Sequence, residues 1–217
     1  MDMWDALVDI GFAGLITLPF ILKSQRTRIL MAFVLLGVYQ LLFVYAGYGA
    51  WTMANSIDGG PLGIISWASI LVFGTIQMDY LKEYKSKEFI KKSMILGIPL
   101  IILGLGLSFL KPMEIWEFSQ RSMTMAYPIV ASGLSVVTFA AFYLVADIWK
   151  WKIPHLALLG MNPLAIYILQ QVLIEFYGDA LPKSAMLWQA ILGFLVIYGI
   201  CYLIARYLDR NKFIIKL

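Results

Sequence analysis

The sequence contains very few of the residues from which metal centres and redox sites are usually built. It has one cysteine, Cys201, and one histidine, His155, among 217 residues. A single cysteine excludes an intramolecular disulfide. No Cys/His or His/carboxylate cluster accompanies His155, so the usual zinc ligand sets are missing and we expect no metal site. The sequence also contains no nucleotide-binding glycine loop, nucleophile elbow or zincin motif.

Charge is scarce as well. Charged residues make up 14% of the chain and hydrophobic residues 61%, which is too apolar for a soluble domain of this size. The net charge of +4 does not indicate a nucleic-acid partner, because no base-reading motif surrounds the lysine-rich residues 82–92. We interpret the basic residues as anchors beside anionic lipid. Asp2, Asp5 and Asp9 stand where a secretory signal has basic residues, so we expect no signal peptide.

Long apolar runs fill most of the chain. A hydrocarbon core about 30 Å thick requires about 20 helical residues, and a spanning backbone must satisfy its own hydrogen bonds. The runs therefore predict an all-α polytopic transmembrane bundle of about seven helices, with residues 1–217 as a single transmembrane domain. The predicted helices are 6–22, 29–48, 63–81, 93–110, 122–149, 156–177 and 186–208.

The basic residues predict the orientation of this bundle. Alternate gaps and the C-terminal end hold Lys23, Arg26, Arg28, Lys82, Lys85, Lys87, Lys91, Lys92, Lys150, Lys152, Arg206, Arg210, Lys212 and Lys216. The other gaps hold only Lys111, Arg121 and Lys183. Positively charged loops remain in the cytoplasm, so we expect the N-terminus outside and the C-terminus inside a cytoplasmic (inner) membrane.

A few polar residues fall within the apolar runs. Charged groups at membrane depth usually face a bundle interior or a water-filled cavity. Asp9 is either an interfacial carboxylate near the outer surface or the one acidic catalytic candidate in the first helix. Asp79 lies near the predicted cytoplasmic end of the third helix, where the simpler interpretation pairs it with Lys82. Gln77 and Gln170 suit interhelical hydrogen bonds.

Glycines in the fourth run predict close helix packing. Gly97, Gly104 and Gly106 would allow this helix to approach a neighbour because they carry no side chain.

Asn162 is the most suggestive polar residue of the C-terminal third. It lies in Gly160-Met161-Asn162-Pro163, where asparagine before proline is typical of a helix cap. The alternative is a polar group that lines a cytoplasm-facing pocket. A helix N-terminus also attracts phosphate, which makes this a candidate place for an anionic cofactor.

Several segments together resemble the C-terminal part of the heparan-α-glucosaminide N-acetyltransferase family of membrane acyltransferases. The similar segments follow the same order in the chain and reach its last residue. They are Pro61-Leu62-Gly63-Ile64-Ile65 with Phe73-Gly74, Ser122 to Tyr127, Tyr143-Leu144-Val145-Ala146-Asp147, Gly160-Met161-Asn162-Pro163-Leu164-Ala165-Ile166-Tyr167, and Arg210-Asn211-Lys212-Phe213-Ile214-Ile215-Lys216-Leu217. Met123 departs from the tryptophan that is usual in the second segment.

The resemblance implies an activity and a co-substrate. In that family a cytoplasmic acetyl-CoA donates its acetyl group to an amine on the far side of the membrane. We therefore expect acetyl-CoA or another acyl-CoA as co-substrate and a sugar or lipid amine as acceptor. The resemblance implies that Asn162 and Tyr167 border the acyl-CoA tunnel.

The family's catalytic histidine lies in an N-terminal portion that precedes every segment matched here. His155 is on the wrong side and in the wrong element to replace it. Acyl transfer to an amine requires a base or a nucleophile. We therefore expect a separate N-terminal partner chain that supplies the missing helices. The alternative is a non-enzymatic membrane subunit or a carrier for a lipid or small solute. Self-association into a homo-oligomer is left open.

Overall fold

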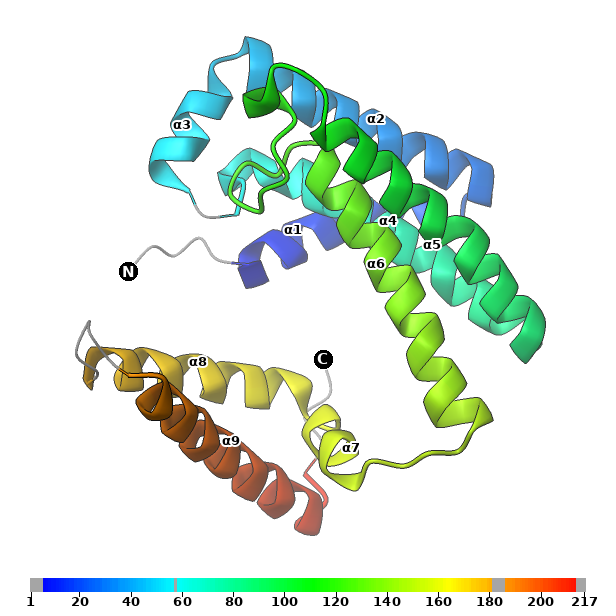
Figure 1. The fold of residues 1–217 in the computed structure, drawn as a ribbon. Coiled ribbons are helices and arrows are strands. Elements are labelled where there is room, and N and C mark those ends of the chain that lie inside the picture. The colour runs from blue at the N-terminus through cyan, green and yellow to red at the C-terminus, as the bar shows by residue number, and fades with distance from the viewer. Residues whose placement is uncertain (1–5, 57, 181–185, 214–217) are drawn as a thin grey trace. The chain divides into compact units, whose positions relative to one another are not determined.

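The computed structural model describes residues 6–56, 58–180 and 186–213, and these fold into helices joined by loops (Figure 1). The chain divides into two compact units, residues 1–149 and residues 150–217, here called unit 1 and unit 2. Each unit is described by itself. The expectation of a single domain over residues 1–217 stays a prediction.

Unit 1 contains most of the helices. They are α1 (Ala6–Thr17), the short η1 (Leu18–Phe20), α2 (Gln25–Tyr45), α3 (Tyr48–Asn55), α4 (Gly60–Glu83), α5 (Ser86–Ser108), the short η2 (Met113–Ile115), α6 (Ala126–Tyr143) and the π-helical turn η3 (Leu144–Ile148). Unit 2 contains α7 (Pro154–Gly160), α8 (Pro163–Ala180) and α9 (Leu187–Arg210).

The helices confirm an all-helical, multi-pass membrane protein at a coarse level. In the described residues α2, α4, α5, α6 with η3, and α9 are long and apolar enough to span a membrane. The pair α7 and α8 adds a sixth span if it is counted as one, although it bends by 91° at its break. The apolar stretch Leu7–Phe20 is shorter than a full span. The predicted count of seven and the predicted orientation are not confirmed.

Helix α4 is the centre of unit 1, because it packs against α1, α2, α5 and α6. The buried core lies where these helices meet. It is formed by Ala32, Leu36, Val72, Phe73, Ile76, Tyr80, Phe89, Leu100, Ile129 and Ala140.

Helices α5 and α6 pack at close range through glycines. A Cβ on Gly97 would lie 3.0 Å from the carbonyl oxygen of Gly133, and one on Gly133 would lie 2.6 Å from that of Gly97. A Cβ on Gly104 would lie 2.9 Å from the carbonyl oxygen of Ala126. The predicted packing role is therefore confirmed for Gly97 and Gly104. It is wrong for Gly106, which has open space around its Cβ position.

The predicted helix 122–149 begins four residues late, because side chains of α2 and α4 hold its first residues in an irregular segment. The Tyr39 hydroxyl donates to the carbonyl of Ser122 at 2.7 Å, and the Ser66 hydroxyl donates to the carbonyl of Met123 at 2.8 Å. Such side-chain partners replace the hydrogen bonds of a helix turn. Helix α6 then starts at Ala126.

The predicted helix 156–177 is broken in the structure. Proline lacks a backbone N–H, and it disfavours a helical conformation in the preceding residue. Pro163 therefore ends the continuity at Asn162, and α8 begins at Pro163 itself. The backbone carbonyl of Asn162 accepts from Ile166 N–H at 3.1 Å, as expected for the residue before a helix.

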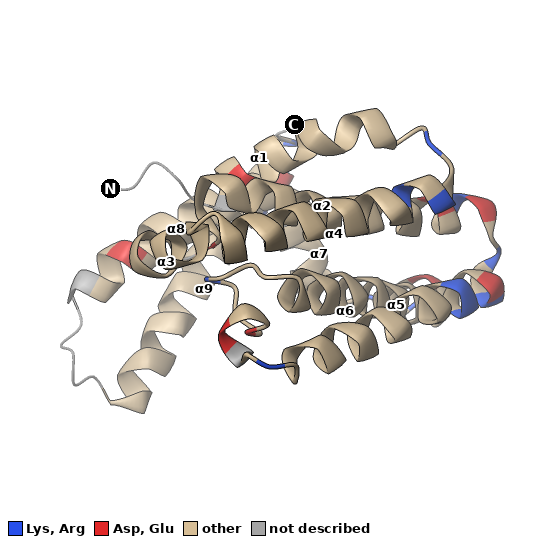
Figure 2. Cartoon of the chain, turned by 90° about the horizontal axis from the view of Figure 1, so that it is seen from above, with Lys and Arg blue, Asp and Glu red and all other residues tan. Residues whose placement is uncertain are grey.

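Most basic residues of unit 1 gather at one end of its helices (Figure 2). Helices α2 and α4 run antiparallel, since Arg28 in the first turn of α2 pairs with Asp79 in the last turns of α4. The connections that carry Lys23 and Lys85 therefore share one end, here called the basic end. Arg121 belongs to the opposite end, where it donates to the carbonyl of Ser56. We predict that the basic end faces the cytoplasm.

Candidate functional site

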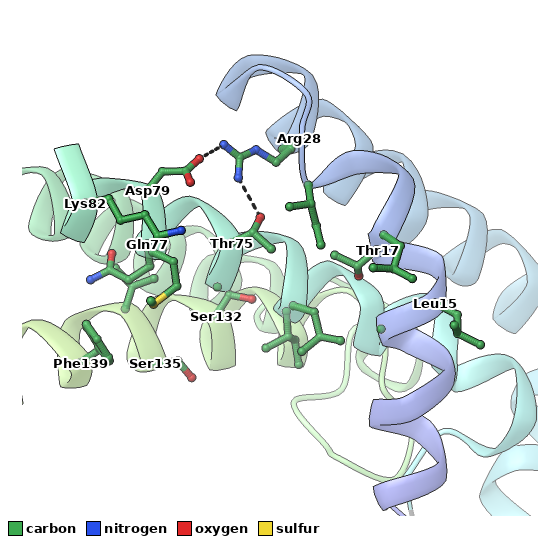
Figure 3. A pocket seen from close by; sticks show the side chains of 18 of the residues that line it. Leu15, Thr17, Arg28, Thr75, Gln77, Asp79, Lys82, Ser132, Ser135 and Phe139 are labelled. Atoms are coloured by element: carbon green, nitrogen blue, oxygen red, sulfur yellow. Dashed lines mark hydrogen bonds and ion pairs between the residues drawn. The ribbon is translucent and has the colours of Figure 1, made fainter. Parts of the chain in front are cut away.

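A cavity of about 760 Å³ lies in unit 1 between α1, α4 and α6 (Figure 3). Its lining surface is mostly apolar, and its charged residues Arg28, Asp79 and Lys82 lie toward the basic end. The polar lining residues are Thr17, Arg28, Thr75, Gln77, Asp79, Lys82, Ser132 and Ser135. The cavity is therefore amphiphilic, with an apolar body and a charged end.

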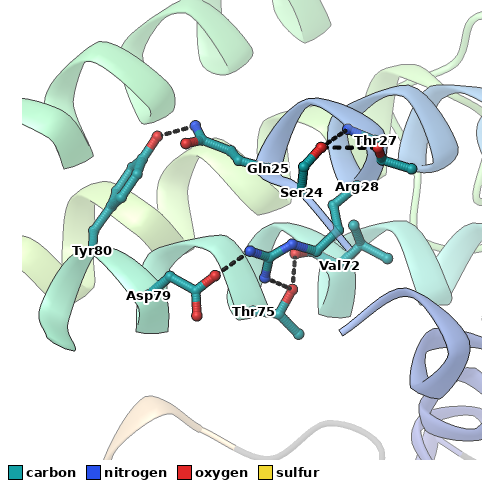
Figure 4. Close-up of polar contacts among 8 residues, drawn as sticks. All are labelled: Ser24, Gln25, Thr27, Arg28, Val72, Thr75, Asp79 and Tyr80. Carbon is teal, nitrogen blue, oxygen red and sulfur yellow. Dashed lines mark hydrogen bonds and ion pairs between the residues drawn. The ribbon is translucent and has the colours of Figure 1, made fainter. Parts of the chain in front are cut away.

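Arg28 is the charged centre of this end, and the start of α2 places it there. The Ser24 hydroxyl accepts from Thr27 N–H at 3.3 Å, so that it caps the helix and α2 begins at Gln25. Arg28 then lies inside the helix and points toward α4 (Figure 4). Its Nη1 donates to the Thr75 hydroxyl at 3.0 Å, and its Nη2 donates to the carboxylate of Asp79.

The two charges of this ion pair differ in burial. The side chain of Arg28 is 5% exposed, whereas that of Asp79 is 38% exposed. The Nε of Arg28 and the Oε1 of Gln77 are buried without a hydrogen-bond partner among the described residues. The other end of the Gln77 amide donates to the Ser93 hydroxyl at 2.9 Å. Two buried residues that line the cavity, Arg28 and Gln77, therefore each keep one polar atom without a hydrogen bond to a described residue.

A smaller polar pocket of about 310 Å³ adjoins the cavity at Arg28. The two spaces share Ile21, Arg28 and Asp79 in their linings. The smaller pocket is otherwise lined by Leu22, Lys23, Ser24, Gln25, Ile76, Tyr80 and Glu83. The Gln25 amide donates to the hydroxyl of Tyr80 there. The ion pair thus stands between an apolar space and a polar one.

Asp9 is buried in α1, with none of its surface exposed. Helix α1 packs against α4. Both interpretations of Asp9, as an interfacial carboxylate and as a catalytic acid, stay predictions. The charge of Asp9 acts on α3, outside the candidate spans. Burial raises the pKa of Tyr48, and the carboxylates of Asp9 and Asp58 raise it further. Asp9 lines neither the cavity nor the smaller pocket, so the structure does not place it beside Arg28.

Asn162 and Tyr167 belong to unit 2, whereas the residues that line the cavity belong to unit 1. The Asn162 amide is 2% exposed and donates to the backbone carbonyl of Phe213 at 3.0 Å. Through this bond it holds the segment after α9 against the break between α7 and α8. The hydroxyl of Tyr167 accepts from the Gln171 amide at 3.1 Å. Their role at an acyl-CoA tunnel stays a prediction.

Two further residues from the sequence argument also lie in unit 2. Gln170 lines a cavity of about 420 Å³ between α8 and α9. The ring of His155 packs on that of Tyr202, with centroids 5.3 Å apart.

Sequence reasoning missed Arg28 as a site residue and assigned Asp79 to Lys82. The signal that was available is the serine at position 24. A serine four residues before Arg28 predicts a helix start that would place Arg28 in the first turn rather than in the loop. The pairing itself has no sequence signature, because 51 residues separate the two partners.

Comparison with known proteins gives no assignment. Neither a family model, nor a curated protein, nor a solved structure matches this chain. Among residues 6–56, 58–180 and 186–213, no group of three or more His, Cys, Asp and Glu side chains is arranged to hold a metal ion. The geometry of the cavity is therefore the basis for a functional proposal.

Proposed function

We propose that this chain is an acyltransferase-type membrane protein that receives the acyl group of a cytoplasmic acyl-CoA in unit 1. One observation carries the proposal: an apolar cavity of about 760 Å³ ends at a buried arginine on the basic side of the unit. Burying an acyl chain stabilises a complex by about 0.8 kcal/mol per CH₂. A buried guanidinium favours an anionic head at the same time.

The basic end supplies the approach for such a ligand. Lys82 lines the cavity beside Arg28, and Lys23 lines the adjoining polar pocket. Positive charges at an entrance raise the local concentration of an anionic ligand and speed its association. Under the predicted orientation this entrance opens to the cytoplasm, where acyl-CoA is found.

The opposite end of unit 1 offers a place for an amine acceptor. A groove of about 740 Å³ is lined there by aromatic residues that include Phe43 and Phe118, together with Glu114 and Glu117. Carboxylates attract an ammonium group, and aromatic faces add a cation–π contribution. Deprotonation of that amine requires a base, which we assign to a separate partner chain, as the family resemblance implies.

Binding of acyl-CoA to the purified chain tests this proposal. The chain in maltoside micelles is titrated with acetyl-CoA, hexanoyl-CoA and decanoyl-CoA by calorimetry. We expect affinity to rise with chain length, because each added CH₂ enters the apolar cavity. A substitution in the cavity wall, Gly74→Leu, should remove the gain with chain length, since Gly74 lines the cavity and has open space at its Cβ.

The matched control for this experiment is Gly106→Leu, at another helical glycine with open space that does not line the cavity. It should leave the chain-length dependence unchanged. Affinity that is absent for every acyl-CoA, with candidate partner chains supplied, would overturn the proposal.

A carrier for a lipid or small solute is a second candidate. The observation that favours it is that the two spaces share Ile21, Arg28 and Asp79, so that a polar pocket and a largely apolar cavity meet at the ion pair. Flux of labelled lipid or solute into liposomes that contain the chain measures this activity. Absence of flux for every solute tested would count against the carrier.

A further inference from the structure

We infer that Arg28 binds the phosphate of an acyl-bearing amphiphile and that Asp79 is the exchangeable partner which this phosphate displaces. The inference names the chemistry that the proposed acyl cavity recognises, and it rests on the proposed use of that cavity. From the sequence alone, Arg28 is only one of the basic residues that predict the orientation of the bundle.

The hydrogen-bonding capacity of Arg28 is only partly used. A guanidinium has five N–H donors in a planar fork. Among the described residues Nη1 bonds Thr75, Nη2 bonds Asp79, and Nε bonds nothing. A tetrahedral phosphate offers several acceptor oxygens and takes two parallel N–H bonds from one arginine. Arg28 therefore keeps N–H donors that no described residue uses, and displacement of Asp79 opens its Nη2 group to a phosphate.

The difference in burial decides which partner moves. Arg28 is held inside the bundle, where an unpaired charge would be costly. Asp79 is more than a third exposed, so its carboxylate reaches water by a change of rotamer. Displacement of Asp79 by phosphate keeps Arg28 paired throughout. The exchange therefore avoids an unpaired buried charge, and the site can load and unload.

The surrounding charges favour an anion over a cation. Among the described residues, Arg28 and Lys82 line the cavity with Asp79 as its one carboxylate, and Lys23 and Glu83 balance each other in the adjoining pocket. Once Asp79 turns outward, the polar end of the cavity carries two positive charges. The apolar walls hold an acyl chain, and the polar pocket with Ser24 and Gln25 receives the rest of a head group.

Phosphate on an acyl-bearing molecule has two sources, a membrane phospholipid and a fatty acyl-CoA. The experiment separates them with three probes: dodecyl phosphate, decanoyl-CoA and inorganic phosphate. Binding is measured by calorimetry on the purified chain in maltoside micelles, which contain no phosphate. The variants are Arg28→Lys and Asp79→Asn. The control is Arg26→Gln, an exposed residue two positions away on the same helix.

We expect Arg28→Lys to weaken dodecyl phosphate binding by about tenfold or more, because lysine cannot form the bidentate pair. Asp79→Asn should tighten it about three- to tenfold, because a neutral amide competes less for Arg28. Arg26→Gln should change it by less than about twofold. Inorganic phosphate should bind far more weakly than dodecyl phosphate, since it leaves the cavity unfilled.

Asp79→Asn tests the inference even if the Arg28 variant does not fold. It is expected to bind dodecyl phosphate more tightly, and a misfolded protein would not gain affinity. Unchanged or weaker binding in Asp79→Asn would overturn the inference. Equal losses in Arg28→Lys and Arg26→Gln would also overturn it, since they would indicate surface attraction only. If inorganic phosphate binds as tightly as dodecyl phosphate, the claim that the ligand carries an acyl chain is refuted.

The two proposals fail separately in the same titrations. If dodecyl phosphate binds with the expected variant pattern and decanoyl-CoA does not, phospholipid is the source: the acyl-CoA proposal fails and the inference stands. If decanoyl-CoA binds equally to wild type, Arg28→Lys and Asp79→Asn, the inference fails and the acyl-CoA proposal stands.

Discussion

The packing of α5 against α6 yields a prediction with a control in the same helix. In Gly104→Ala the new Cβ would lie 2.9 Å from both the carbonyl oxygen of Ala126 and the backbone nitrogen of Val130. Neither backbone atom can rotate away, so the helices must separate. Overpacking of this kind costs about 1–3 kcal/mol. Replacing glycine by alanine within a helix offsets about 1 kcal/mol of this, so we expect a net loss of up to about 2 kcal/mol.

Gly106→Ala makes the same chemical change two residues further along α5, where no atom of the described residues lies within 4 Å of the Cβ position. It should stabilise the protein by about 0.5–1 kcal/mol. Thermal unfolding in maltoside micelles, followed by circular dichroism, compares the two. A difference of about 2 kcal/mol corresponds to several degrees in Tm for a chain of this size. Equal Tm values for the two variants would refute close packing at Gly104.

Three further changes have expected outcomes. Asp79→Asn should lower the free energy of unfolding by about 1–3 kcal/mol in detergent titrations, less than for a fully buried pair because Asp79 is partly exposed. Asn162→Ala should cost about 1 kcal/mol and speed carboxypeptidase digestion of the C-terminus, because the bond to Phe213 is lost; unchanged digestion would contradict this tether. Burial raises the pKa of Tyr48 above 10.0, so its neutral phenol stabilises the fold below pH 10 and this contribution is lost at higher pH. In pH-dependent unfolding, Tyr48→Phe should have a weaker alkaline decline than wild type.

Hydropathy alone predicts the helical, membrane-spanning character of this chain, because a spanning backbone has few alternatives to helix. It predicts the helix ends poorly, since these depend on contacts between distant residues. The Tyr39 hydroxyl, for example, holds the carbonyl of Ser122 and delays α6. No local pattern around either residue indicates this contact.

The site shows the same limit. The charge count treats Arg28 as one of several loop cations, although the Ser24 cap draws it into α2 and toward Asp79. The position before Pro163 predicts Asn162 as a helix cap or a pocket residue, and its bond to the carbonyl of Phe213 is a contact that neither interpretation includes. Charge patterns thus predict on which end a cation lies, and tertiary contacts decide whether it is buried.

The most direct test of the central claim is photo-crosslinking with an acyl-CoA that carries a diazirine at the end of its acyl chain. If the cavity of unit 1 receives the acyl group, mass spectrometry should find adducts on its lining residues Leu15, Met78 and Phe139. Unlabelled decanoyl-CoA should suppress these adducts. Adducts confined to α9 or to other lipid-exposed helix faces, and insensitive to decanoyl-CoA, would contradict the account.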